Sequence, residues 1–266
     1  MNGTRAGRSL ALGVAVVLAA GLLGACSHDR SADGPEGRAA VTSHLTEDTI
    51  ADAITAGMAE MTSYRTVGTF GGDGVMGSEL DGSVTVVDLL NTGEGQDVHV
   101  TMAMGDQDFE AFVVGGEVWM RVGGEVFVHA TAEDAALDPD LAELLKMAAP
   151  TDIAAQAQGF VTALKSFETL GADVVDGVET WGFAIPVDPA CIPEAQQTMA
   201  PQQLALVKEM TATYWFGVDS VPRKCDVAIT MNNGFVVTMQ STISLINEVA
   251  PITPPPDSVV IEYADW

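Results

Sequence analysis

Alternation of apolar and polar side chains over residues 97–122 constrains this fold more than any other feature of the sequence. A period of two places successive side chains on opposite faces of a β-strand. Turns containing glycine break the pattern at Gly105-Asp106, Gly115-Gly116 and Gly123-Gly124, a spacing of roughly ten residues that favours an antiparallel meander. The apolar positions, which would share one face, are Val98, Val100, Met102, Phe109, Ala111, Val113, Val118 and Met120.

More strands are predicted in the C-terminal half. Residues 174–175 precede an Asp176-Gly177 turn, and the alternation resumes over residues 181–187. Further strands are expected at about 211–219, 224–231 and 234–245, and a short last strand is expected to end near Glu262.

Helical spacing of apolar residues appears in a few short segments. Thr46 is a suitable N-cap for a first helix that contains Ile50 and Met58. Two amphipathic stretches follow at about 137–148 and 153–164, and another helix is expected over 194–209. The inward positions of the two middle helices are Leu141, Leu144, Leu145, Phe160 and Leu164.

Strands, then helices, then strands again are typical of an α+β fold. A sheet of about ten strands cannot stay flat, because strand twist curls it. We therefore expect a large curled antiparallel sheet, a half-open β-barrel, with helices covering its concave apolar face. Short helices would fill this face incompletely, which predicts an apolar hollow. Neither a repeat nor a linker interrupts residues 46–266, so they are expected to form a single domain.

Charge excludes one large class of function. The 266 residues include 37 acidic side chains and only 11 lysines and arginines, for a formal net charge of −26. A nucleic-acid partner is not expected, because neutralising phosphates requires a basic surface. The chain is 47% hydrophobic, which also argues against a disordered polyelectrolyte.

Residues 1–25 have the pattern of a cleaved signal peptide. Arg5 and Arg8 precede an apolar run from Leu10 to Leu23, which as a helix would rise only about 21 Å and could not span a hydrocarbon core of ~30 Å. The tetrapeptide Leu23-Gly24-Ala25-Cys26 resembles the bacterial lipobox, whose cysteine is acylated. Cys26 is therefore expected to anchor an exported protein to the outer face of the cytoplasmic membrane, with residues 26–45 as a flexible tether. A plain secretory signal that ends near a free cysteine is the alternative.

Two further cysteines remain, Cys191 and Cys225. Two thiols in an exported protein most simply form a disulfide, which here would close a loop of roughly 35 residues and contribute about 4 kcal/mol in the chain-entropy model. Metal ligation or a catalytic thiol are the alternatives, although no histidine lies near either cysteine in the sequence.

Several motifs, in their order along the chain, carry a family resemblance. They are Ser63-Tyr64-Arg65-Thr66, residues 112–120, residues 170–180, residues 214–224 and Pro254-Pro255-Pro256-Asp257, together with the lipobox. In this combination the chain resembles the actinobacterial LppX/LprG lipoproteins. The resemblance implies a fold like that of the LolA-type lipoprotein carriers, with a hydrophobic cavity for acyl chains. It also implies an acylated lipid or glycolipid as cargo and a membrane lipid exporter as a partner. The cysteine pair and the acidity depart from the family.

The histidines do not suggest catalysis. His28 and His44 lie in the tether, and His99 and His129 fall on the polar side of predicted strands, where an exposed surface is expected. Gly71-Gly72-Asp73-Gly74 has the composition of a turn and lacks the spacing of a calcium loop.

The acidic alternation of Asp106, Asp108 and Glu110 predicts a solvated strand face. No enzyme, cofactor or metal is therefore predicted. The leading hypothesis is a lipid carrier whose cavity is lined by the apolar strand and helix positions named above. A non-enzymatic module that docks an envelope enzyme or transporter through its acidic face is the alternative, and an unrecognised hydrolase is a remote third.

Overall fold

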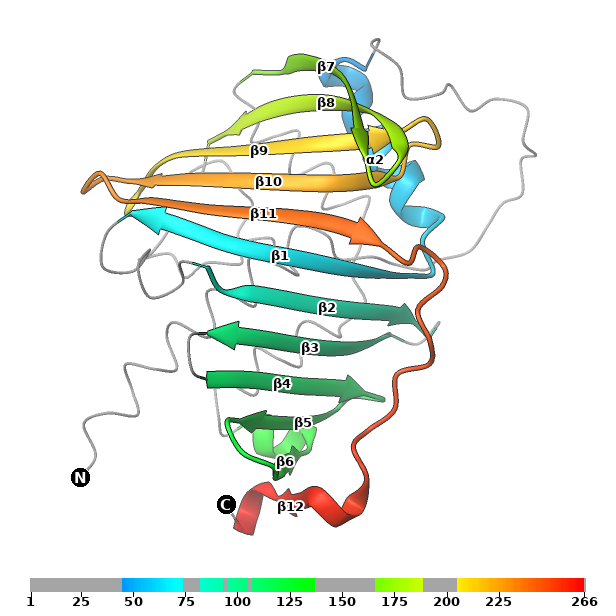
Figure 1. The fold of residues 1–266 in the computed structure, drawn as a ribbon, viewed down its shortest axis with the longest axis vertical. Helices are drawn as coiled ribbons and strands as arrows, with labels where there is room; N and C mark the ends of the chain where they lie inside the picture. The colour runs from blue at the N-terminus through cyan, green and yellow to red at the C-terminus, as the bar shows by residue number, and fades with distance from the viewer. Residues whose placement is uncertain are drawn as a thin grey trace.

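The computed structural model describes residues 45–73, 82–92, 95–104, 107–136, 166–188 and 205–265. The first strands are β1 (Ser63–Asp73), β2 (Val84–Asn91), β3 (Gln96–Met104), β4 (Gln107–Val114), β5 (Glu117–Val122) and β6 (Phe127–Ala130). The later strands are β7 (Glu168–Val175), β8 (Val178–Val187), β9 (Val207–Gly217), β10 (Pro222–Met231), β11 (Val236–Ser244) and β12 (Val260–Glu262). All belong to one sheet in the order β12-β6-β5-β4-β3-β2-β1-β11-β10-β9-β8-β7 (Figure 1). The sheet is open, with β12 and β7 as its edges, as expected from the sequence.

The first predicted helix is confirmed as α2 (Glu47–Ala59), which begins after Thr46. The Thr46 backbone N–H donates to Thr49 Oγ1 at 2.9 Å, so the free end of the helix is capped locally. Ile50 and Met58 are buried in the main hydrophobic cluster. Gly57 allows a close approach, because a Cβ at this position would lie 1.8 Å from the Ser220 carbonyl oxygen. The helix can therefore pack directly on the turn between β9 and β10.

The predicted meander is also confirmed, since β3, β4 and β5 pair in antiparallel fashion. So is the hairpin of β7 and β8, in which Asp176 and Gly177 have φ of 50° and 81°. Positive φ at both central residues is typical of a type I′ turn, whose twist matches that of the flanking strands.

Three expectations were wrong. Gly71, Gly72 and Asp73 are not a turn but the last residues of β1, paired with β11. Residues 207–209 are not helical but begin β9. β12 pairs with β6 in parallel, so the sheet is not wholly antiparallel. Residues 245–259, called the strap here, connect β11 to β12 and bring β12 beside β6 by running along the strand ends (Figure 1).

Alternation gives the sheet two unlike faces. The face called the buried face carries the main hydrophobic cluster and packs against α2. The opposite face, called the polar face, carries Arg65, Asp88, His99, Glu110 and Arg121. No helix within the described residues is long and apolar enough to cross a membrane. The helices expected at 137–148 and 153–164, and residues 194–204 of the next one, lie outside the described part of the chain.

Candidate functional site

The predicted apolar strand positions gather on the buried face. The cross-strand pairing aligns Val98 with Val113 and then Val118, and the next row aligns Val100 with Ala111 and then Met120. Residues paired in this way point to the same side of the sheet. Met102 and Phe109 form the start of a third row. Except for Met120, which is partly buried against the cluster, each of these side chains is no more than 2% exposed.

The buried face continues onto the later strands. Phe183 stacks on Phe167 with a centroid distance of 5.2 Å and lies 6.2 Å from Phe216. Ile185 and Ala212 are wholly buried next to them. Burying one such aliphatic or aromatic side chain contributes about 1.5–3 kcal/mol. A surface this wide and this apolar cannot be left in water, so it has to be covered by other parts of the protein or by a ligand.

Cys225 lies on this face, is wholly buried and forms no disulfide within the described residues. Burial raises the pKa of Cys225 to about 12, although a hydrogen bond with Tyr214 acts in the opposite direction. A thiol with so high a pKa is a poor nucleophile. The disulfide with Cys191 stays a prediction, because Cys191 lies outside the described residues, as do Cys26, Leu141, Leu144, Leu145, Phe160 and Leu164.

A few polar side chains interrupt the buried face. Thr66, Thr85 and Gln96 are buried there, and each has side-chain atoms that make no hydrogen bond in the described structure. The sequence does not mark them as interruptions, because an isolated threonine or glutamine in an alternating strand carries no distinctive signal.

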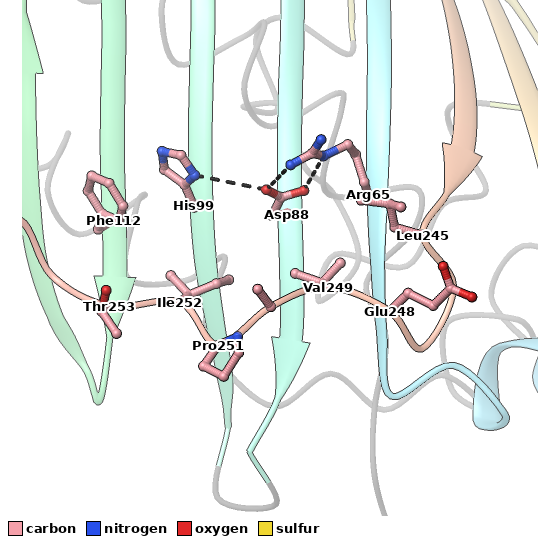
Figure 2. A pocket seen from close by; sticks show the side chains of 11 residues that line it. Arg65, Asp88, His99, Phe112, Leu245, Glu248, Val249, Pro251, Ile252 and Thr253 are labelled. Carbon is pink, nitrogen blue, oxygen red and sulfur yellow. Dashed lines mark hydrogen bonds and ion pairs between the residues drawn. The ribbon is translucent and has the colours of Figure 1, made fainter.

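On the polar face, the strap closes a pocket of about 350 Å³ (Figure 2). Asn247 fixes the start of the strap: its Oδ1 accepts from the Thr62 backbone N–H at 2.6 Å, and its Nδ2 donates to the Glu60 carbonyl at 3.0 Å. The strap then passes over the strand residues that form the floor of the pocket. The lining consists of Arg65, Asp88, His99 and Phe112 from the strands and Leu245, Glu248, Val249, Ala250, Pro251, Ile252 and Thr253 from the strap.

The charges below the strap are paired with one another. The Arg65 guanidinium donates twice to the Asp88 carboxylate, at 2.6 and 2.7 Å. Glu110 contacts His99 Nε2 at 2.8 Å and an Arg121 guanidinium nitrogen at 2.6 Å. Burial alone would raise the pKa of Glu110, but the hydrogen bonds from His99 and Arg121 outweigh it and hold that pKa below its ordinary value. This network neutralises its own charges and is suited to holding strands together.

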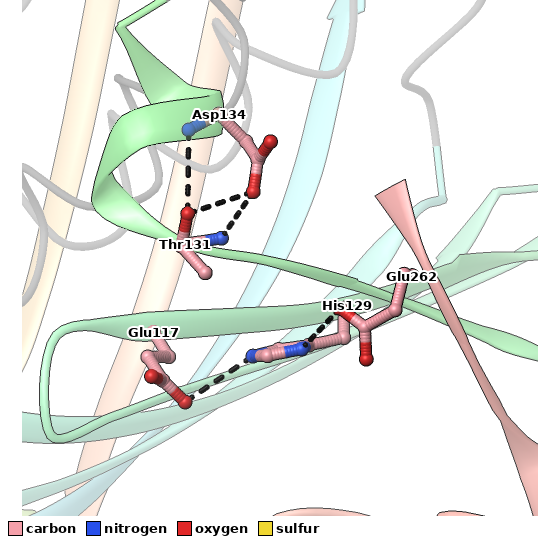
Figure 3. Close-up of polar contacts among 5 residues, drawn as sticks. All are labelled: Glu117, His129, Thr131, Asp134 and Glu262. Atoms are coloured by element: carbon pink, nitrogen blue, oxygen red, sulfur yellow. Dashed lines mark hydrogen bonds and ion pairs between the residues drawn. The ribbon is translucent and has the colours of Figure 1, made fainter. Parts of the chain in front are cut away.

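The expectation of a solvated face was therefore wrong for Glu110, and the expectation of an exposed surface was wrong for His99 and His129. His129 lies between two carboxylates, with Nε2 3.2 Å from Glu117 and Nδ1 3.0 Å from Glu262 (Figure 3). Its ring also stacks on Trp119 at 4.7 Å. These contacts hold β12 against β6. Nothing in the sequence could reveal this, because Glu262 lies 133 residues away from His129.

Beside this contact begins a short helix, α4 (Ala132–Ala135). The Thr131 backbone N–H donates to Asp134 Oδ2 at 2.9 Å, and the Asp134 backbone N–H is 3.4 Å from Thr131 Oγ1 (Figure 3). The hydrogen bond from the Thr131 backbone lowers the pKa of Asp134. This cluster is a helix cap. Among the described residues, no three histidines, cysteines or acidic residues are grouped so that they could hold a metal ion.

Two solved structures are similar to the chain at low sequence identity. The lipoprotein LppX of Mycobacterium tuberculosis matches 78% of this chain and 100% of its own, with 13% identity and a TM-score of 0.48. LprF of Mycobacterium bovis matches 79% of this chain and 97% of its own, with 16% identity and a TM-score of 0.49. No protein-family model matches the chain, and no relative was found among curated proteins.

Proposed function

We propose that this protein is an exported, membrane-anchored lipoprotein that binds the acyl chains of envelope lipids or glycolipids against its buried face. It would carry them between the membrane, or an exporter in it, and the outer envelope. The observation that supports this most is the apolar surface formed by β3 to β5. There, the rows that begin at Val98, Val100 and Met102 present aliphatic, thioether and aromatic side chains only.

An acyl chain is the ligand that such a surface favours. Each buried CH₂ contributes ~0.8 kcal/mol, so one long chain supplies enough free energy for useful affinity without any specific polar contact. Met102 and Met120 are flexible and polarisable, and such side chains adapt to ligands of different shape.

The anchor is proposed to be an acylated Cys26. With a net charge of −26, the protein is repelled by anionic headgroups. Attachment to a membrane therefore has to come from acyl chains, and two or three of them hold a protein stably on a bilayer. A Cys26→Ala substitution should move the protein from the membrane fraction to the soluble fraction.

Lipid binding can be tested with the full chain carrying Cys26→Ala, which removes the anchor's own acyl chains from the measurement. Native mass spectrometry after mild purification should show bound lipid, and solvent extraction should release it. The protein should also take up a fluorescent fatty-acid probe. A protein that retains no lipid and takes up no probe would contradict the proposal.

The acidity supports a second candidate, a module that docks a basic partner in the envelope. In that case a partner should be retained at low salt and lost at high salt, because screening weakens attraction between exposed charges. The buried face would then be filled by the protein's own side chains and would bind no probe.

A further inference from the structure

Gln96 and Asn91 lie opposite each other at one end of the buried face. Asn91 is the last residue of β2 and Gln96 the first of β3, and the two are paired in the register. Alternation places Gln96 on the same face as Val98, and Asn91 on the same face as Leu89. Gln96 is only 4% exposed. Two primary amides therefore border the apolar rows where the strands begin and end.

Most of the polar atoms of these amides have no partner. In the described structure, Gln96 Nε2, Gln96 Oε1 and Asn91 Oδ1 are buried and make no hydrogen bond. Asn91 Nδ2 donates to the Met61 carbonyl at 3.0 Å, which fixes the orientation of that amide. The Asn91 oxygen is thereby held in one direction instead of rotating to find a partner.

Folding alone gives no reason for this arrangement. A buried donor or acceptor without a partner destabilises the folded state, and native proteins contain few of them. Leucine or methionine at position 96 would fill similar space without this cost and would extend the apolar rows. Three unpartnered atoms at one place therefore indicate a group that is supplied from outside the described residues.

We propose that Gln96 and Asn91 form a polar subsite for the uncharged, hydroxyl-bearing headgroup of an acyl lipid. The inference rests on the proposed lipid-binding function and adds the class of headgroup. Gln96 Oε1 and Asn91 Oδ1 accept hydrogen bonds from hydroxyl groups, and Gln96 Nε2 donates to a hydroxyl or ester oxygen. A glycerol or sugar headgroup supplies both kinds of partner within a few bonds.

The charges around this subsite also select against an anionic headgroup. Arg65 pairs with Asp88, and Arg121 pairs with Glu110, both on the polar face, so neither guanidinium is available at the amides. The net charge of −26 repels anions in addition. The acyl chain would run from the amides along the first apolar pair, Leu89 and Val98.

The test compares two oleoyl ligands that differ in their hydroxyl groups, monooleoylglycerol and methyl oleate. Displacement of a fluorescent fatty-acid probe is measured on the full chain carrying Cys26→Ala. We expect monooleoylglycerol to bind about tenfold more tightly, a difference typical of one or two net hydrogen bonds. Gln96→Leu should remove this preference and leave the affinity for methyl oleate unchanged.

Thr85→Val serves as the matched control, because it removes another buried, unpartnered hydroxyl from the same face and should leave the preference intact. Gln96→Met replaces the leucine variant if that variant does not fold. An unchanged preference in the Gln96 variant, or an equal loss of both ligands, would overturn the inference while the lipid-binding function stands. If the protein without a Gln96 substitution binds neither ligand, the proposed function fails and the inference fails with it.

Discussion

The two faces of this sheet are built from alternate residues of the same strands, yet their interactions differ in kind. On the polar face, one cross-strand row passes from Arg65 through Asp88 and His99 to Phe112, Trp119 and His129. Its members form ion pairs and ring stacks, including His99 on Phe112 at 4.2 Å. Each of these contacts requires one particular partner in one geometry.

The buried face has few such requirements. Contacts between its aliphatic side chains are non-directional. The side-chain polar atoms of Gln96 and Thr85 have no hydrogen-bond partner in the described structure. The two faces of the sheet therefore have different roles. The polar face fixes the register of β1 to β6, which leaves the buried face free to accept ligands of variable shape. Substitutions on the two faces should therefore have different effects.

The largest loss of stability is expected for a substitution on the part of the buried face that the later strands form. Phe183→Ala should lower the free energy of unfolding by about 3–5 kcal/mol, because Phe183 is wholly buried between Phe167 and Phe216 and a cavity would remain. Urea unfolding at neutral pH measures this. A loss below about 1 kcal/mol would show that this part of the face is not closely packed.

The next largest effect is on binding. Val113→Trp should reduce uptake of a fatty-acid probe by at least about tenfold, with a loss of stability below about 1 kcal/mol, if the side chain faces a space for a ligand. The matched control is Val114→Trp, at the neighbouring position on the polar face, which should leave uptake unchanged. A loss of about 1–3 kcal/mol for Val113→Trp would instead indicate overpacking of a filled core.

A smaller, pH-dependent effect is expected on the polar face. Glu110→Gln should cost about 1–2 kcal/mol at pH 7, because His99 and Arg121 lose a charged acceptor. The pKa of Glu110 is lowered on folding, so its contribution is present above the ordinary value of 4.5 and is lost as the pH falls through the folded value. The difference between the two proteins in urea unfolding should therefore shrink below about pH 4.5. A difference that stays constant down to pH 3 would contradict this account.

The smallest effect is expected at the edge of the sheet. Glu262→Gln weakens the contact with His129, and since Glu262 is largely exposed the cost should be under about 1 kcal/mol. Hydrogen exchange should nevertheless become faster in β12 and β6, and it should stay unchanged in β9 and β10. Uniformly faster exchange would show that β12 supports the whole sheet.

Local patterns in the sequence were sufficient to predict most strands and their faces. The alternation from Val98 to Val113 and the turn at Asp176-Gly177 depend on neighbouring residues, so they could be recognised without a structure. The order of the strands could not, because nothing near Ser63 indicates that β1 pairs with β11. The contact of His129 with Glu262 and the parallel pairing of β12 were missed for the same reason.

The candidate site could be predicted in its apolar part only. The periodicity of apolar residues predicts which face of the sheet they occupy. The role proposed for Gln96 depends instead on its burial beside Asn91 without hydrogen-bond partners. That depends on the complete fold. The sequence can show that a polar residue occupies an inward position of an alternating strand. It cannot show whether the amide of that residue is hydrogen-bonded in the folded protein.

The position of β1 in the centre of the sheet affects how the protein can be made. β1 pairs with β2 on one side and with β11 on the other. In the second pair, Arg65 lies opposite Ser244, which is near the other end of the chain. Contacts of such high sequence separation slow folding, and until they form β1 presents an open edge that can aggregate. If the protein is exported as proposed, β1 keeps this open edge on the far side of the membrane until β11 has also crossed.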